Sequence, residues 1–143
     1  MTAEMNHDRT VFVVDDEPAV RKALSRLLAA GGYNARLFAS AREFMQYYKP
    51  GSPGCLLVDF SMPEITGLDL QRWLASSGDT LPVVFLTGLD EIPDPIREIM
   101  MDVAFDVFSK PCPATALFGC LEKALTTPRE ALKKPGPAPP LPP

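Results

Sequence analysis

The sequence predicts an α/β fold in which a parallel sheet of about five strands carries helices on both faces. Short apolar runs alternate with longer segments of helical period, which is typical of parallel strands joined by right-handed crossovers. Two of these runs, Thr10–Asp15 and Cys55–Asp59, are continuously apolar rather than alternating, as in strands that are buried on both faces. The chain has 143 residues, of which 46% are hydrophobic, enough to form one core.

The first two βα units occupy the N-terminal third of the chain. Thr10–Asp15 is the first expected strand, and Glu17–Ala30 follows as an amphipathic helix with apolar residues at the i, i+4, i+7 and i+8 positions. A proline is tolerated in its first turn, and a glycine pair ends it. Tyr33–Phe38 is a short strand. Ser40 is expected to cap the next helix, with Glu43 at the capping-box position.

Three more units complete the alternation. Cys55–Asp59 is the third strand, and a loop and a helix at about Gly67–Ser76 follow it. The remaining elements are expected as strand, helix, strand and helix, at Leu81–Thr87, Pro95–Asp102, Phe105–Ser109 and Ala114–Leu125.

Composition divides the chain into a folded domain and two flanking segments. Residues 1–9 are expected to be a flexible N-terminus, residues 10–126 the domain, and residues 127–143 a proline-rich tail or linker. The end of that tail, Lys133–Pro143, is mostly proline and cannot form a core. Such a tract can also serve as a ligand for aromatic-lined grooves.

Charge and hydropathy exclude several classes of protein. The chain has 14 basic and 18 acidic residues, net −4, so it lacks the basic character expected of a nucleic-acid binder. No apolar run approaches the roughly 20 residues of a membrane span, and the polar N-terminus has no signal-peptide core, so a cytoplasmic protein is expected. Cys55, Cys112 and Cys120 show no CxxC spacing and are expected to be buried, reduced thiols.

Five polar residues fall at the carboxyl ends of expected strands: Asp15, Asp16, Asp59, Thr87 and Lys110. In a parallel sheet these ends meet at one edge, where ligands bind. Three neighbouring carboxylates repel one another, and a divalent cation removes that penalty. Oxygen ligands with open coordination positions suit Mg²⁺. A carboxylate such as Asp59 could then act as a nucleophile toward phosphorus, with Lys110 stabilising the transferred group.

Each of these residues also has an ordinary structural explanation. The pair Asp15 and Asp16 is in a position to cap the helix that starts at Glu17. Lys110, which precedes Pro111, could be a surface lysine in a turn. The occurrence of all five residues at the expected strand ends is what favours a functional site.

The sequence resembles response-regulator receiver domains of bacterial two-component systems over about residues 10–125. The match rests on VVDDEPAVR at 13–21, on D-x-x-M-P-x-x-x-G from Asp59 to Gly67, and on the pairs Thr87-Gly88 and Lys110-Pro111. The segment GYNARLFASAREFM at 32–45 is similar to the FixJ-like subgroup.

This resemblance implies a doubly wound (βα)₅, flavodoxin-like fold and phosphotransfer from a sensor histidine kinase onto Asp59. It implies that Mg²⁺ is held by Asp16, Asp59 and the backbone carbonyl of Ser61, with Asp15 nearby. It also implies that Thr87 and Lys110 contact the phosphoryl group and that the Lys110–Pro111 bond is cis.

Departures from the family pattern lie in the fourth helix and fifth strand, Pro95–Asp102 and Phe105–Ser109, the usual signalling and homodimer face. Val107 stands where the family carries an aromatic that rotates inward, with Phe108 beside it, and Val103 stands where a glycine is usual. These changes represent either drift on a tolerant surface or an altered route for the signal.

Three functions are compatible with the residues. The first is a phosphoacceptor switch, not an enzyme, that acts on an unknown output protein; the second is the N-terminal receiver half of a FixJ/LuxR-type DNA-binding transcription factor. The third, a Mg²⁺-dependent phosphohydrolase, lacks the second aspartate of a D-x-D core because position 61 is Ser. Dinucleotide binding is disfavoured because the first βα turn has no glycine triad.

Overall fold

The computed structural model describes residues 9–87, 92–110 and 112–128, and within them it contains a five-stranded parallel sheet of order β2-β1-β3-β4-β5. The strands are β1 (Thr10–Val14), β2 (Asn34–Phe38), β3 (Cys55–Val58), β4 (Val83–Thr87) and β5 (Asp106–Ser109). The strand order reverses beside β1, since the chain moves first to one edge of the sheet and then to the other. The expected doubly wound fold is thereby confirmed.

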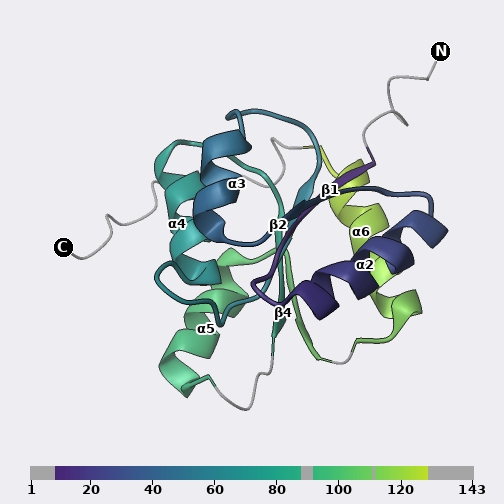
Figure 1. Ribbon diagram of the computed structural model, residues 1–143. Coiled ribbons are helices and arrows are strands. Elements are labelled where there is room, and N and C mark those ends of the chain that lie inside the picture. Colours follow the sequence, from purple (N-terminus) through teal and green to yellow (C-terminus); the bar gives the residue numbers. More distant parts are fainter. Residues whose placement is uncertain (1–8, 88–91, 111, 129–143) are drawn as a thin grey trace.

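Five helices cover the two faces of the sheet (Figure 1). They are α2 (Pro18–Ala30), α3 (Ala41–Tyr47), α4 (Gly67–Ser76), α5 (Asp94–Val103) and α6 (Ala114–Thr126). Helices α3, α4 and α5 lie on one face, and α2 and α6 lie on the other. None of the helices in the described part of the chain is long and apolar enough to cross a bilayer.

Two apolar clusters hold these layers together, one on each face of the sheet. Alternate residues of β1 divide between them, because successive side chains of a strand point to opposite faces. Phe12 and Phe44 belong to the cluster beneath α3, α4 and α5, and their rings meet edge to face with centroids 5.5 Å apart. Leu28 and Leu121 belong to the cluster beneath α2 and α6.

The cysteines line the cluster beneath α2 and α6. All three thiols are free, and Cys55 and Cys120 are buried as expected. Cys112 is only half-buried, so the expectation of burial is wrong for this residue, which lies in the short connection before α6. Burial raises the pKa of each thiol, that of Cys120 to about 12, which keeps them protonated and weakly nucleophilic.

Side-chain caps begin two of the helices. The Ser40 hydroxyl accepts from the Glu43 N–H at 3.1 Å, as expected, but the Glu43 carboxylate accepts from the N–H of Ala39 instead of closing the box on Ser40. A complete capping box, not expected from the sequence, begins α4: the Thr66 hydroxyl accepts from the Asp69 N–H at 3.1 Å, and the Asp69 carboxylate accepts from the Thr66 N–H at 3.0 Å. This box fixes the start of α4 directly after the D-x-x-M-P-x-x-x-G loop.

The expected element boundaries agree with the structure to within about two residues. Helix α5 extends one residue beyond each expected end, and β5 begins one residue later than expected. Most of the expected N-terminal segment and of the proline-rich tail lies outside the described residues, as do Gly88 and Pro111. The expected cis bond before Pro111 therefore stays a prediction.

Arg9, just before β1, joins the start of the sheet to α6. Its guanidinium donates to the Gly32 carbonyl at 3.0 Å, stacks 4.4 Å from the centre of the Tyr33 ring and pairs with Glu122 at 3.0 Å. The Tyr33 hydroxyl donates to the same Glu122 carboxylate at 2.6 Å. Burial and the neighbouring Glu122 raise the pKa of Tyr33 to about 12.

Replacement of Tyr33 by phenylalanine should lower the free energy of unfolding by about 1–2 kcal/mol, because it removes a hydrogen bond to a charged group. Tyr47→Phe is the matched control, since Tyr47 is 53% exposed and the change should stay within about 0.5 kcal/mol. Urea denaturation measures both effects. In an absorbance titration Tyr33→Phe should reduce the amplitude of the phenol absorbance change near pH 12; an unchanged amplitude would contradict the assignment.

Candidate functional site

The first acidic residues of the site follow β1 directly. The Asp15 N–H donates to the Phe38 carbonyl at 3.2 Å, so this residue extends the β1–β2 pairing by one position. Its carboxylate accepts from the Glu17 N–H at 3.0 Å. Glu17 itself is the N-cap residue of α2 and makes no side-chain cap bond. The Asp pair therefore does not cap α2 in the usual way, although Asp15 supports the turn that leads into it.

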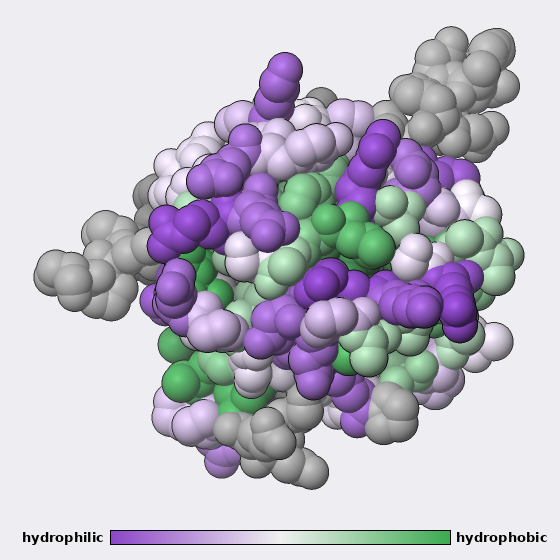
Figure 2. All heavy atoms as spheres, in the orientation of Figure 1, coloured by the Kyte–Doolittle hydropathy of each residue, from purple (hydrophilic) through white to green (hydrophobic). Residues whose placement is uncertain are grey.

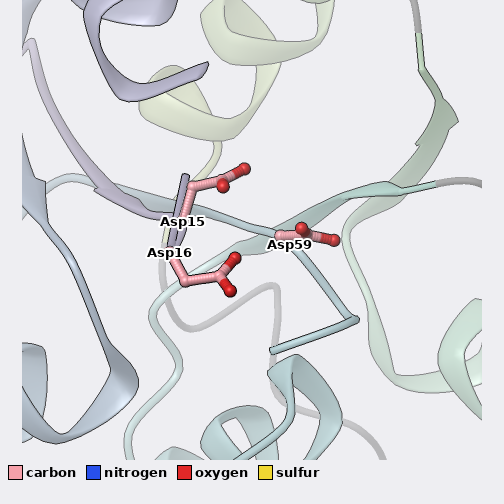
Figure 3. A group of neighbouring side chains, drawn as sticks. All are labelled: Asp15, Asp16 and Asp59. Atoms are coloured by element: carbon pink, nitrogen blue, oxygen red, sulfur yellow. The ribbon is translucent and has the colours of Figure 1, made fainter. Parts of the chain in front are cut away.

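Asp59 follows β3, the strand next to β1. Its N–H donates to the Val14 carbonyl at 3.1 Å, and its carboxylate accepts from the Ser61 N–H at 3.1 Å. Figure 3 shows Asp15, Asp16 and Asp59 gathered at the ends of these two strands. Each offers a carboxylate oxygen, and these atoms all lie within 4.8 Å of one another. Asp15 and Asp59 are only 2% and 7% exposed, whereas Asp16 is exposed.

A buried hydroxyl and an ammonium complete the constellation. Thr87 is the last residue of β4 and is 1% exposed, and its carbonyl accepts from the Lys110 N–H at 3.1 Å. The Lys110 ammonium lies 3.2 Å from Asp59 Oδ2 and 3.4 Å from Asp15 Oδ2. All five residues singled out in the sequence thus end neighbouring strands at one edge of the sheet.

The electrostatics of Asp59 reflect a charge held away from water. Burial raises the pKa of Asp59 above its ordinary value, although the Lys110 ammonium and the Ser61 N–H act to lower it, and the Asp15 carboxylate raises it further. Burial also disfavours the charged form of Lys110, but the carboxylates of Asp59 and Asp15 outweigh that effect and raise the pKa of the ammonium group. Lys110 is therefore the cation that partly offsets the charge of the two buried carboxylates.

The donor set fits a small, hard divalent cation. The described residues offer three carboxylates and no nitrogen or sulfur ligand at this position, which suits Mg²⁺. Because Asp16 and Ser61 are exposed, the cluster is open to solvent on one side, where water or a phosphate oxygen could complete the coordination shell. The Ser61 backbone is tied to the cluster through its N–H bond to Asp59.

The loop beneath Asp59 depends on a glycine. A Cβ atom at Gly67 would lie 2.8 Å from the Asp59 carbonyl oxygen and 3.0 Å from Phe60 Cα, closer than real Cβ contacts. The motif alone shows that a glycine occupies position 67, but the reason for it depends on this close approach. In the same loop Glu64 has a φ of 68°, a left-handed conformation that is unfavourable for a residue other than glycine, asparagine or aspartate.

The substitution Gly67→Ala should lower the free energy of unfolding by about 1–3 kcal/mol, because the added methyl meets backbone atoms that cannot move without displacing Asp59. Gly119→Ala is the matched control: that site in α6 is exposed with open space around it, and alanine should stabilise the helix by up to about 1 kcal/mol. Urea midpoints measure both. Equal urea midpoints for Gly67→Ala and Gly119→Ala would show that Gly67 is not closely packed against the Asp59 backbone.

In the absence of metal, Asp59→Asn should make the domain more stable at neutral pH. A raised folded-state pKa means that folding favours the protonated carboxyl, so this contribution is present at low pH and lost as the pH rises through the folded-state pKa. The stability gap between variant and wild type should therefore widen from about pH 4 to about pH 7. Urea denaturation in EDTA measures it, with the exposed Glu98→Gln as control. A difference in unfolding free energy that does not change with pH would contradict the burial of a charged Asp59 carboxylate.

Comparison with known proteins connects this site to a family. Residues 11–122 match the response regulator receiver domain family. Response regulator protein TmoT of Ectopseudomonas mendocina is 37% identical over 120 residues, which cover 84% of this chain and 54% of TmoT. Transcriptional regulatory protein FixJ of Rhizobium meliloti is 32% identical over 117 residues, covering 82% of this chain and 57% of FixJ.

Solved structures of response regulators also resemble this chain. The structure described as FixJ-N has a TM-score of 0.74 and 32% identity, and the match covers 82% of this chain and 94% of that one. The response regulator StyR also has a TM-score of 0.74, with 37% identity over 81% of this chain and 58% of its own. The chain spans about half the length of the curated relatives it matches. It belongs to the response regulator receiver domain family, with FixJ-like proteins among its relatives.

Proposed function

We propose that this chain is a phosphorylation-controlled switch whose phosphoacceptor is Asp59. The observation that carries the proposal is the contact of one ammonium group, Lys110, with two buried carboxylates at a strand-end edge that also holds Thr87 and the exposed Asp16. An arrangement that concentrates negative charge and supplies one fixed cation is suited to receiving a further anionic group when a metal ion is bound.

Each residue has a distinct role in this proposal. Asp59 supplies the oxygen that attacks phosphorus, while the bond from phosphorus to the donor's leaving group breaks. Lys110 stabilises negative charge on the transferred group, and the Thr87 hydroxyl donates a hydrogen bond to one of its oxygens. Asp15, Asp16, Asp59 and the Ser61 carbonyl would hold Mg²⁺, which when bound would offset the negative charge of the carboxylates and of the phosphoryl group.

The proposed donor is a phosphohistidine on a sensor histidine kinase, and the chain acts in the cytoplasm as a switch rather than as an enzyme that turns over a separate substrate. Residues 10–126 would form the switching domain between the flexible N-terminus and the proline-rich tail or linker. Phosphorylation replaces the single charge of the Asp59 carboxylate with a phosphoryl group that carries nearly two negative charges and three acceptor oxygens, enough to bias a two-state surface by a few kcal/mol.

The proposed output and homodimer surface is formed by α5 and β5. Ile99 and Met101 of α5 are 39% and 57% exposed, unusual for large apolar side chains, and Figure 2 shows apolar side chains over this helix. Sedimentation of the phosphorylated protein tests this surface, with Met101→Glu expected to weaken self-association. Tyr47→Ser on α3, a similarly exposed apolar residue, is the control.

A second candidate function is the receiver half of a longer DNA-binding regulator. It is favoured by the coverage of about half of each curated relative, one of which is a transcriptional regulatory protein. The net charge of −4 argues against DNA contact by the residues of this chain themselves, so any such contact would come from a further domain. The length of the reading frame after Pro143 decides between the two candidates.

The substitution Asp59→Asn should abolish incorporation of phosphate from acetyl phosphate in the presence of Mg²⁺, because an amide cannot act as the nucleophile. Wild-type protein should be labelled, and EDTA should prevent it. Intact-mass spectrometry gives the measurement.

Glu64→Gln provides the matched control for this experiment. It removes an exposed carboxylate from the same loop, one whose described contact is an ion pair with Arg42, and labelling should stay at the wild-type level. Labelling of Asp59→Asn at that same level would disprove the assignment of the phosphoacceptor.

A further inference from the structure

Arg21, the last residue of the VVDDEPAVR motif, makes a contact with the acidic cluster. Its Nη1 atom donates to the backbone carbonyl oxygen of Asp15 at 2.7 Å. The guanidinium therefore reaches back from the first turn of α2 to the chain segment that carries the two adjacent aspartates. The side chain is partly buried, in contrast to its neighbour Lys22, which is exposed.

The position of Arg21 is electrostatically unfavourable for α2 alone. A cation in the first turn of a helix opposes the helix dipole by several tenths of a kcal/mol, and this first turn contains no acidic residue to offset it. The short hydrogen bond to a carbonyl, made by a charged donor, provides a compensating interaction. The side chain is thus held toward the strand end rather than released to solvent.

The carbonyl that Arg21 binds belongs to the peptide unit joining Asp15 to Asp16. The other polar groups of Asp15 are also held: its N–H by Phe38, and its carboxylate by Glu17 N–H and Lys110. Figure 3 shows that the Asp15 and Asp16 side chains leave the backbone in different directions. The plane of this peptide unit fixes the positions of the Asp16 N and Cα atoms and so limits the directions that its side chain can take, and the bond from Arg21 restrains that plane.

We propose that Arg21 is a positioning residue for the cation site: by holding the Asp15 carbonyl, it directs the exposed Asp16 carboxylate toward the other two. The inference rests on the proposed function, since it assumes that the cluster binds Mg²⁺. Outer-sphere groups that orient metal ligands commonly change affinity by 10- to 100-fold. Among the described residues Arg21 forms no ion pair with the carboxylates of Asp15, Asp16 or Asp59, and its bond is to the Asp15 backbone oxygen alone.

A positioning role can be separated from a simple effect of charge, because the two predict opposite changes in Mg²⁺ affinity when Arg21 is replaced. A nearby positive charge repels Mg²⁺, so its removal alone should tighten binding. Loss of a positioning contact should instead weaken it. The adjacent residue Lys22 carries the same charge on the same helix and is exposed, so Lys22→Gln measures the effect of charge without the contact.

The test is calorimetric titration of the full chain with Mg²⁺, comparing wild type, Arg21→Met and Lys22→Gln. Arg21→Met keeps the apolar stem and a good helix former. It should raise the dissociation constant about tenfold or more, while Lys22→Gln leaves it equal or lower. An equal or lower dissociation constant for Arg21→Met would overturn the proposal. Arg21→Gln, whose amide is too short to reach the carbonyl, repeats the test should the methionine variant not fold.

Labelling with acetyl phosphate over a range of Mg²⁺ concentrations supplies the second measurement. The Arg21→Met rate should be low at limiting Mg²⁺ and approach the wild-type rate at saturation, since Asp59, Thr87 and Lys110 are unchanged. A deficit that is the same at every Mg²⁺ concentration would indicate a structural role and overturn the proposal. Failure of wild type to bind Mg²⁺ or to be labelled would count against the proposed function itself.

Discussion

Repulsion among carboxylates is the constraint around which this edge of the sheet is organised. Two of the three aspartates are almost entirely removed from water, and all three offer oxygen atoms within 4.8 Å of one another. Burial of such charges costs several kcal/mol unless they are paired. Lys110 supplies one positive charge by direct contact and so offsets only part of this cost. The remaining excess of negative charge favours the approach of a cation to this edge.

Backbone N–H groups also stabilise the buried carboxylates. Asp15 and Asp59 each accept a hydrogen bond from the N–H two residues further along, so each carboxylate is oriented by its own turn. Asp79, in the loop before β4, accepts the same kind of bond from the Leu81 N–H, yet among the residues that the structure describes it belongs to no group of three acidic side chains. The local turn alone therefore does not define the site. What distinguishes it is that two such turns end adjacent strands, β1 and β3.

The sequence predicts the strand ends well, but not the contacts that depend on the path of a loop or on the reach of a long side chain. Strand ends are fixed by apolar runs and parallel topology, so the residues that follow them could be assigned to one edge before any coordinates were known. Gly67 could be recognised as part of a motif, but its closeness to the Asp59 carbonyl depends on the path of the loop. The reach of Arg9 to Glu122 and of Arg21 to Asp15 depends on long side chains that cross between elements, and spacing carries no signal for such contacts.

The same geometry bears on how a signal could leave the site. Val107 and Phe108 are adjacent in β5, and strand geometry sends them to opposite faces: Val107 packs against the cluster beneath α3, α4 and α5, and Phe108 against the other. Phe108 therefore cannot take the place of an aromatic ring at position 107, although the two are neighbours in the sequence. In β5, Val107 pairs with Phe85 and Ser109 pairs with Thr87, so the α5 face carries a small aliphatic side chain where a ring could have stood. Coupling between a phosphoryl group and that face therefore cannot use rotation of an aromatic ring at position 107.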